Sequence, residues 1–299
     1  MLLNSQTLCF EWLRSKKGKI KPSTYDKYDM ILNKYLLDFF NSYHLDQLDI
    51  SIIKDYFISL LNQGLSSSVV QSIKNVLKAI YITYENQYGL NHIDFSLVKI
   101  EQEKKENASL LDEQFNQLHQ YCLNTIDAIH LGILLAMDTG MMIGEICALK
   151  VSDIDLNKKM ISITKKTQRV KNEESGSKTV YEVADVEWPI KRNIAIPQSL
   201  IQYLEIYLKD KNKNNYLLSN NQHASDFKKL QRGLDKITQQ LGFKTTYKDL
   251  RNIYKEHCMK KCLDVNVVME LLGLQSMKLS LPQNYNSSDE EKIKQVNKL

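Results

Sequence analysis

Apolar side chains recur every three to four residues through the first hundred residues of this 299-residue chain. The spacing predicts one helix that begins near Pro22, a second that follows Asp49 and ends before Gly64, and a third that begins after Ser66. Asp49 and Ser66 are of the types that cap helix N-termini, and glycine is common just beyond a helix end. About four short helices with brief connections indicate a compact helical domain over residues 1–100.

A polar segment without apolar periodicity follows this domain. It reads VKIEQEKKENAS from Val98 to Ser109, and its composition is typical of a linker. We therefore predict a linker over residues 101–109 and a second domain over residues 110–299.

The second domain mixes helical and strand patterns. Continuous apolar character predicts a buried helix over Ala128–Asp138. The further predicted elements are strands over Lys159–Gln168, Val180–Val186 and Arg192–Ile196, a helix over Pro197–Lys209, two helices within Thr245–Gly273, and a helix-compatible tail from Asp289 to Leu299. The predicted fold class is mainly α with a small antiparallel β-sheet.

The bulk composition narrows the class of protein. Hydrophobic residues make up 43% and charged residues 25%, as in soluble globular proteins. The longest apolar run, Leu131–Met137, is too short for a membrane span, and the first residues do not resemble a signal peptide, so we expect a cytoplasmic protein. Among the 5 cysteines only Cys258 and Cys262 are close, and without a second pair at ligand spacing no metal site is expected.

The positive charge is concentrated in particular segments. The net charge is only +5, but residues 214–261 hold ten Lys/Arg against four Asp/Glu. A second cluster comprises Lys165, Lys166, Arg169 and Lys171. Such faces suit a polyanion such as nucleic acid, although a solvated lysine-rich surface explains the charge equally well.

Two segments together resemble the tyrosine recombinase, or phage integrase, family. TGMMIGEICALKVSDIDL, residues 139–156, follows the family pattern T-G-hydrophobic-Arg-x-G-E-x-x-x-L-x-hydrophobic-x-D-I-D. YKDLRNIYKEHCMKKCLDVNVVMELLGLQSM, residues 247–277, follows its H-x-L-R and L-L-G-H segments. The resemblance implies a helical core-binding (SAM-like) domain followed by a catalytic-type domain. It also implies double-stranded DNA as the partner and cleavage through a covalent phosphotyrosine, without metal or other cofactor.

Part of the family's catalytic set is kept. By resemblance, the second arginine is Arg251, the histidine three residues before it is replaced by Lys248, and the nucleophile is best matched by Tyr285. For Arg251 an ion pair with an acid such as Glu145 stays open as a structural alternative to phosphate contact. Tyr285 and Lys248 have the alternatives of a packing residue and a solvated lysine.

Other catalytic positions are substituted. The family's first arginine falls on Met142 and its last histidine on Leu274. The lysine expected on the small sheet falls near Trp188, where Lys191 is the nearest cation and a candidate replacement general acid. Arginine suits the charge that develops on a phosphate under attack, and losing one such donor typically costs about 10²–10³ in rate. The substitutions therefore predict impaired cleavage.

The family holds duplex DNA between its two domains, which suggests where this chain would contact it. The candidate contacts are polar residues at helix starts, on helix faces and on the sheet: Lys21, Ser23, Thr24, Lys27, Ser67, Ser68, Gln71, Lys74, Lys165 and Lys166. Ordinary helix capping and solvated polar faces are the competing explanation for each of them.

Three hypotheses for function remain open. The first is a DNA-binding protein of this fold with impaired catalysis, from a mobile element or phage remnant, acting alone or beside an active recombinase. The second is a working site-specific recombinase that uses Tyr285, and the third is an interaction module or decaying remnant that no longer binds DNA. The tail from Ser287 to Leu299 resembles the segment that the family passes to a neighbouring subunit, which predicts pairing through the tail in a homo-oligomer or with a partner recombinase.

Overall fold

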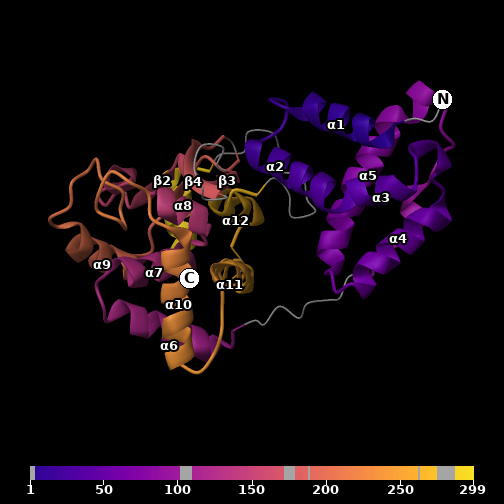
Figure 1. The fold of residues 1–299 in the computed structure, drawn as a ribbon. Coiled ribbons are helices and arrows are strands. Elements are labelled where there is room, and N and C mark those ends of the chain that lie inside the picture. Colours follow the sequence, from indigo (N-terminus) through magenta and orange to yellow (C-terminus); the bar gives the residue numbers. More distant parts are fainter. Residues whose placement is uncertain (1–3, 102–109, 172–178, 188, 262, 275–286) are drawn as a thin grey trace. The chain divides into compact units, whose positions relative to one another are not determined.

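The computed structural model describes residues 4–101, 110–171, 179–187, 189–261, 263–274 and 287–299 (Figure 1). The chain divides into two compact units: residues 1–106 with 170–180, and residues 107–169 with 181–299. Each unit has its own hydrophobic core. Of the predicted linker only Glu101 lies within the described residues, so its exact extent stays a prediction.

Within residues 4–101 the first unit is helical. Its elements are α1 (Ser5–Lys16), α2 (Pro22–Ile31), the π-helical turn η1 (Leu32–Leu36), α3 (Leu37–Ser42), the short 3₁₀ turn η2 (Leu45–Gln47), α4 (Ile50–Asn62), α5 (Ser67–Tyr88) and the 3₁₀ turn η3 (Phe95–Leu97). Buried side chains such as Trp12, Leu32, Phe57 and Leu77 form the core.

The local signals of this unit correspond to the observed helices, with two differences. The helix predicted from Pro22 is observed, but its middle turn is π-helical rather than α-helical. Asp49 caps α4 as expected, because its carboxylate accepts a hydrogen bond from the Ile52 amide at 2.8 Å. Ser66 precedes α5 but makes no side-chain capping bond, so the start of α5 is not stabilised in the predicted way.

The second unit consists of helices around two small sheets. Its elements are α6 (Asp112–Leu123), α7 (Ala128–Thr139), α8 (Ile143–Ala148), the 3₁₀ turn η4 (Val151–Asp153), β1 (Ile154–Asp155), β2 (Met160–Ile163), β3 (Lys165–Lys171), β4 (Thr179–Asp185), β5 (Arg192–Ala195), α9 (Gln198–Leu208), α10 (Phe227–Gln240), α11 (Tyr247–Lys260), α12 (Val265–Leu272) and α13 (Asp289–Val296). The mainly α fold class with small antiparallel sheets is confirmed.

The predicted strand Lys159–Gln168 is two strands in different sheets. β2 lies between β1 and β5, and its register pairs Ile161 with Ile194, whereas β3 pairs with β4 alone. The chain changes partner at Thr164, whose carbonyl accepts a hydrogen bond from the Val186 amide at 2.9 Å. The alternation continues through this residue, so periodicity did not reveal the break.

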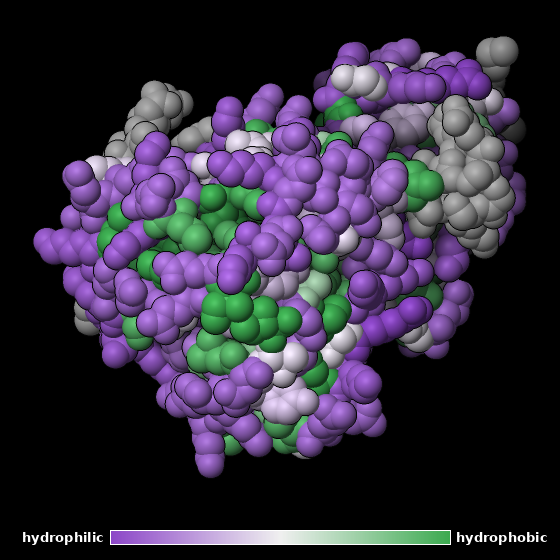
Figure 2. All heavy atoms as spheres, turned by 90° about the vertical axis from the view of Figure 1, so that its left-hand side faces the viewer, coloured by the Kyte–Doolittle hydropathy of each residue, from purple (hydrophilic) through white to green (hydrophobic). Residues whose placement is uncertain are grey.

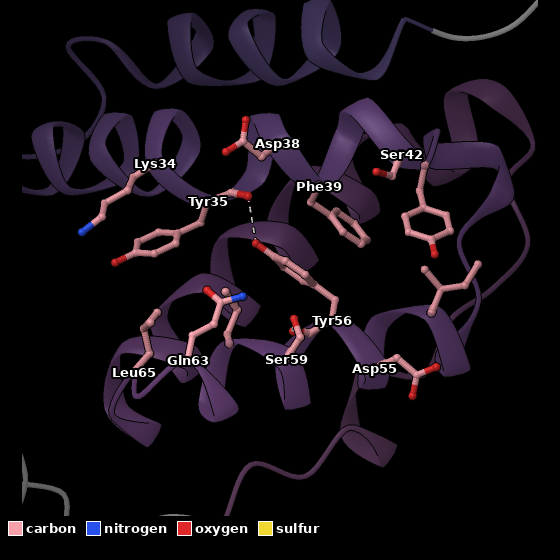
Figure 3. Close-up of a pocket in the computed structure, with 13 residues that line it drawn as sticks. Lys34, Tyr35, Asp38, Phe39, Ser42, Asp55, Tyr56, Ser59, Gln63 and Leu65 are labelled. Carbon is pink, nitrogen blue, oxygen red and sulfur yellow. Dashed lines mark hydrogen bonds between the residues drawn. The ribbon is translucent and has the colours of Figure 1, made fainter.

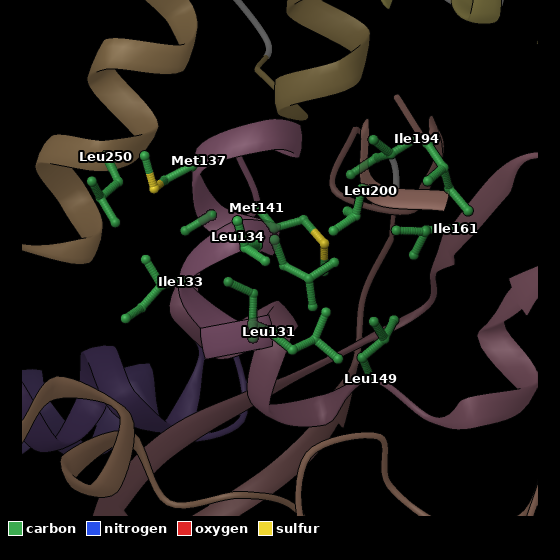
Figure 4. Packing of buried hydrophobic residues seen from close by; sticks show 14 of the residues in the cluster. Leu131, Ile133, Leu134, Met137, Met141, Leu149, Ile161, Ile194, Leu200 and Leu250 are labelled. Atoms are coloured by element: carbon green, nitrogen blue, oxygen red, sulfur yellow. The ribbon is translucent and has the colours of Figure 1, made fainter. Parts of the chain in front are cut away.

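The core of the second unit surrounds α7. This helix is apolar on all sides, as expected for a helix buried by its neighbours, and it packs against α6, α8, α10 and α11. Figure 4 shows Leu134 and Met141 among the side chains that fill the space toward Ile161 and Leu200.

The surface is of the ordinary globular kind. The face in Figure 2 is mostly hydrophilic, with hydrophobic side chains gathered in small patches. Within the described ranges, every helix is too short or too polar to cross a membrane.

Candidate active site

The junction of α7 and α8 requires a glycine. Gly140 follows α7 with φ +63°, in the left-handed region that favours glycine. A Cβ here would lie 2.5 Å from a ring carbon of Tyr254 and 2.8 Å from a methyl carbon of Leu272. The absence of a side chain thus allows α11 and α12 to approach the turn that leads to Met142.

Arg251 holds this junction together. From α11, its Nη1 donates to the Gly140 carbonyl at 2.6 Å and its Nη2 donates to the Leu272 carbonyl at 2.5 Å. Burial lowers the pKa of the Arg251 guanidinium, the charge of Glu145 opposes this shift, and the charge of Arg192 adds to it. The guanidinium has five N–H donors, so these two bonds leave further donors for an anion.

Glu145 forms an ion pair, but with Arg192 rather than Arg251. The Arg192 guanidinium donates from Nη1 to Glu145 Oε1 at 2.7 Å and from Nη2 to Oε2 at 3.0 Å, and both side chains are almost completely buried. Arg192 Nε also donates to the Leu271 carbonyl at 2.7 Å. This bidentate pair joins α8 to β5 and to the end of α12, and the predicted alternative of an Arg251–Glu145 pair is not what the structure shows.

Met142 occupies the N-cap position of α8. Its backbone N–H donates to Glu145 Oε2 at 2.8 Å, so the start of this short helix is fastened by the same carboxylate that binds Arg192. The Met142 side chain is half-buried. A thioether has no hydrogen-bond donor, so this position offers nothing to a phosphate oxygen beyond dispersion contact.

Leu274 ends α12 in a structural role. Gly273 has φ +62° and donates to the Glu270 carbonyl, while the Leu274 amide donates to the Met269 carbonyl, both at 2.9 Å. This pair of bonds is a Schellman motif, in which the residue after the glycine usually makes an apolar contact. Leu274 does so by packing against the small cluster that contains Tyr254 and Leu263.

Strand β3 passes close to the first turn of α8. A Cβ on Gly144 would lie 2.7 Å from the Thr167 carbonyl, so the two backbones touch at this point. Lys166, next to Thr167, is half-buried. Lys165 is more exposed, and its Nζ lies 3.9 Å from Asp185 Oδ1.

The other predicted cations lie at the surface. Lys248 is exposed in the first turn of α11, one turn before Arg251. Lys191 is exposed in the turn before β5, where its backbone N–H donates to the Glu187 carbonyl at 2.9 Å. Trp188 and Tyr285 lie outside the described residues.

Leu274 and Ser287, the described residues nearest to Tyr285 on either side, both bond to α12. Leu274 is bonded to Met269 in α12, and the Ser287 amide donates to Glu270 Oε2 at 2.8 Å. Lys292 of α13 pairs with the other oxygen of Glu270 at 2.5 Å and is 2% exposed. The tail therefore packs against its own unit in this structure.

In the first unit, α2 and α5 present a shared polar face. Lys27 Nζ donates to Ser72 Oγ at 3.1 Å, which brings together the helices that carry most of the predicted DNA contacts. Lys21, Ser23 and Ser68 are exposed, and Thr24, Ser67 and Gln71 are half-buried. Lys74 differs, because its ammonium donates to the Val98 carbonyl and burial, with the charge of Lys78, lowers its pKa.

Comparison with known proteins assigns this architecture. Residues 108–292 match the phage integrase family, and residues 6–61 match the N-terminal SAM-like domain of phage integrases. The first of these matches alone spans more than half of the chain. The chain belongs to the phage integrase family.

Relatives of this integrase-family chain cover nearly its whole length. It is 26% identical to a protein named tyrosine recombinase XerC-like from Caldanaerobacter subterraneus subsp. tengcongensis, over 89% of this chain and 74% of the relative. It is 25% identical to tyrosine recombinase XerA of Pyrococcus furiosus, over 94% and 88%. A solved structure of the Tn1549 transposon integrase in complex with transposon right-end DNA superposes with a TM-score of 0.77, at 17% identity and 97% coverage of each chain. This last likeness shows a shared fold.

Sequence reasoning missed Arg192, the buried partner of Glu145. One signal was available, because Arg192 occupies the inward-facing register of β5 shared with Ile194. An arginine at an apolar register position predicts a buried acid opposite it. The family pattern includes Gly144, but the reason for a glycine there is not local, since the close approach comes from a strand more than twenty residues away.

Proposed function

We propose that this integrase-family chain binds DNA and that its ability to cleave DNA is strongly impaired. The observation that carries the proposal is Met142 at the N-cap of α8, next to the Arg251-bonded turn. By family resemblance an arginine belongs here. A methionine leaves Arg251 as the only guanidinium of the expected pair.

The expected loss is large. Removing one preorganised donor to the reacting phosphate costs about 10²–10³ in rate. Leucine at position 274 removes a second catalytic group, the histidine of the family pattern. The Leu274 side chain packs in an apolar cluster, whereas a histidine would offer a hydrogen-bond donor. Effects of residues that act together do not add, so we take the combined loss as at least that of the missing arginine.

The groups that remain favour residual rather than full activity. Arg251 keeps N–H donors that can bind a phosphate. For the catalytic lysine of the small sheet we propose Lys166 rather than Lys191, because β3 lies against α8 at Gly144 whereas Lys191 is in an exposed turn. Tyr285 would be the nucleophile, and the described residues that flank it, Leu274 and Ser287, bond to α12. A working recombinase therefore stays the alternative.

Binding of duplex DNA rests on charge and on the relatives. The Tn1549 integrase of similar fold was solved with its transposon DNA. In this chain the polar face joined by Lys27 and Ser72, and the lysines of β3, supply the positive surface that phosphates require. We propose that this DNA binding takes place in the cytoplasm and that the protein originates from a mobile element.

Covalent trapping tests the impairment. A pool of nicked duplexes with randomised recognition arms would be incubated with the unchanged chain and with Met142→Arg, Met142→Gln and Tyr285→Phe/Met142→Arg variants. We expect Met142→Arg to form the protein–DNA adduct at least about 10²-fold faster than the unchanged chain. Met142→Gln, similar in size but neutral, should give no such gain, and the Tyr285→Phe double variant should give no adduct.

Two results would refute parts of this proposal. An adduct formed by the unchanged chain as fast as by Met142→Arg, and lost on Tyr285→Phe, would establish the working recombinase instead. Absence of any shift of duplex DNA in low-salt gels would remove DNA binding and favour the interaction module.

Pairing through the tail is a further part of the proposal. α13 would have to leave its own unit to reach a neighbour, which would break the buried Lys292–Glu270 pair unless the neighbour rebuilds it. An exchanged tail that restores the same pair in the next subunit satisfies this requirement.

A further inference from the structure

The first unit contains a pocket that is lined by none of the predicted DNA contacts. It has a volume of about 620 Å³ and lies between the η1–α3 segment and α4 (Figure 3). Four aromatic residues, Tyr35, Phe39, Tyr43 and Tyr56, line it, together with two aspartates, Asp38 and Asp55. A volume of this order is typical of ligand sites and exceeds that of one side chain.

The aromatic wall is held in place by specific contacts. Tyr56 stacks on Phe39 with ring centroids 4.2 Å apart, and its hydroxyl donates to the Tyr35 carbonyl at 2.8 Å. Tyr35 belongs to the π-helical turn, in which the Leu37 amide donates to the carbonyl of Leu32, five residues earlier. Such turns are rare and concentrate at functional sites, so this wall is a built feature of the unit.

The charge of the pocket is negative. Asp38 and Asp55 are both exposed, and neither forms an ion pair within the described part of the chain. The nearby cation, Lys34, lies over the Tyr35 ring at 5.2 Å from its centroid. Carboxylates repel phosphates, which makes this pocket unsuitable for the DNA backbone and suitable for a cation.

Aromatic faces beside carboxylates recognise one class of group particularly well. A guanidinium stacks on aromatic rings and binds carboxylates in a fork, while its aliphatic stem covers apolar surface. We propose that this pocket binds an arginine-bearing segment of a partner protein, with the guanidinium at one of the two carboxylates and its stem along the aromatic wall. The volume leaves room for an apolar residue that flanks the arginine.

Titration of the full chain with a short peptide tests the pocket. The probe is acetyl-Leu-Arg-Leu-amide, and its control is the same peptide with citrulline, which has nearly the same shape but no charge. We expect saturable changes in the NMR chemical shifts of the amides of η1, α3 and α4. The citrulline peptide should bind at least about tenfold more weakly than the arginine peptide. Asp38→Asn/Asp55→Asn should weaken the arginine peptide by about the same factor.

A matched control separates the pocket from general surface charge. Asp46→Asn removes an exposed acid of the same unit that does not line the pocket, and it should leave binding unchanged. Duplex DNA should shift equally with the Asp38→Asn/Asp55→Asn chain, so failure of the pocket and failure of DNA binding are distinguishable. Equal binding of both peptides, no binding, no effect of the two aspartates, or displacement of the peptide by duplex DNA would overturn the proposal.

Discussion

Replacing Glu145 with glutamine should strongly destabilise the second unit. The change keeps the size and shape of the side chain but removes the charge that faces Arg192 at 2.7 and 3.0 Å. One amide NH₂ would then point at a guanidinium that is 1% exposed. Within the described part of the chain, the other hydrogen-bond partners of this cation are the neutral Leu271 and Ile190 carbonyls.

The expected magnitude follows from burial. Breaking a buried ion pair by removing one partner costs about 3–5 kcal/mol, because the remaining charge stays desolvated. Domains are stable by about 5–15 kcal/mol, so this single change removes a large share of the total. A loss of this size raises the equilibrium constant for opening by about 10²–10⁴.

Hydrogen exchange of the full chain measures this loss unit by unit. We expect faster exchange in α8, β5 and α12, which the pair joins, and unchanged exchange in α1–α5. Asp185→Asn is the matched control, since its partner Lys165 is 3.9 Å away and the two side chains are 86% and 43% exposed. That change should cost no more than about 1 kcal/mol.

A double-mutant cycle provides the decisive comparison. Arg192→Leu alone should be as damaging as Glu145→Gln, whereas Glu145→Leu/Arg192→Leu should lose clearly less than the sum of the single changes, because no unpaired charge remains. If Glu145→Gln cost less than about 1 kcal/mol, or if the changes were simply additive, the reasoning from burial would be wrong.

Three further predictions concern other contacts. Gly140→Ala should lower the unfolding free energy by more than about 1 kcal/mol in urea titrations, because the new Cβ meets a tyrosine ring in a left-handed backbone; an unchanged midpoint would contradict this. Lys292→Met should release α13, because it leaves Glu270 without its ammonium partner. The release should appear as a loss of hydrogen-exchange protection in α13. Protection equal to that of the unchanged chain would count against a tail held by this pair. Burial alone would lower the pKa of His119, but the hydrogen bond and charge of Asp138 outweigh it and raise the pKa above 6.5. The stabilisation by His119 should therefore be complete below pH 6.5 and decline as pH rises through the higher folded value. Urea unfolding of the unchanged chain and of His119→Asn across this range measures it, and a pH-independent difference between them would refute it.

Most of the helices and the membership of the family could be predicted from local features of the sequence. Asp49, Gly140 and Gly273 act through their own backbone or the next turn, so caps and chain reversals can be read from a few adjacent residues. The motifs around Met142 and Arg251 were likewise contiguous, and the match to the phage integrase family confirms the fold that they predicted.

Only the tertiary structure decided which groups meet. The partner of Glu145 is Arg192, 47 residues away; the register of β5 indicates that this arginine is buried but not which acid it meets. At the break between β2 and β3, the Thr164 carbonyl binds the distant Val186 amide. The ammonium of Lys74, a predicted DNA contact, likewise binds the distant Val98 carbonyl. Secondary structure follows from short-range sterics and hydrogen bonds, whereas ion pairs and strand partners depend on how distant segments pack, which requires three-dimensional coordinates.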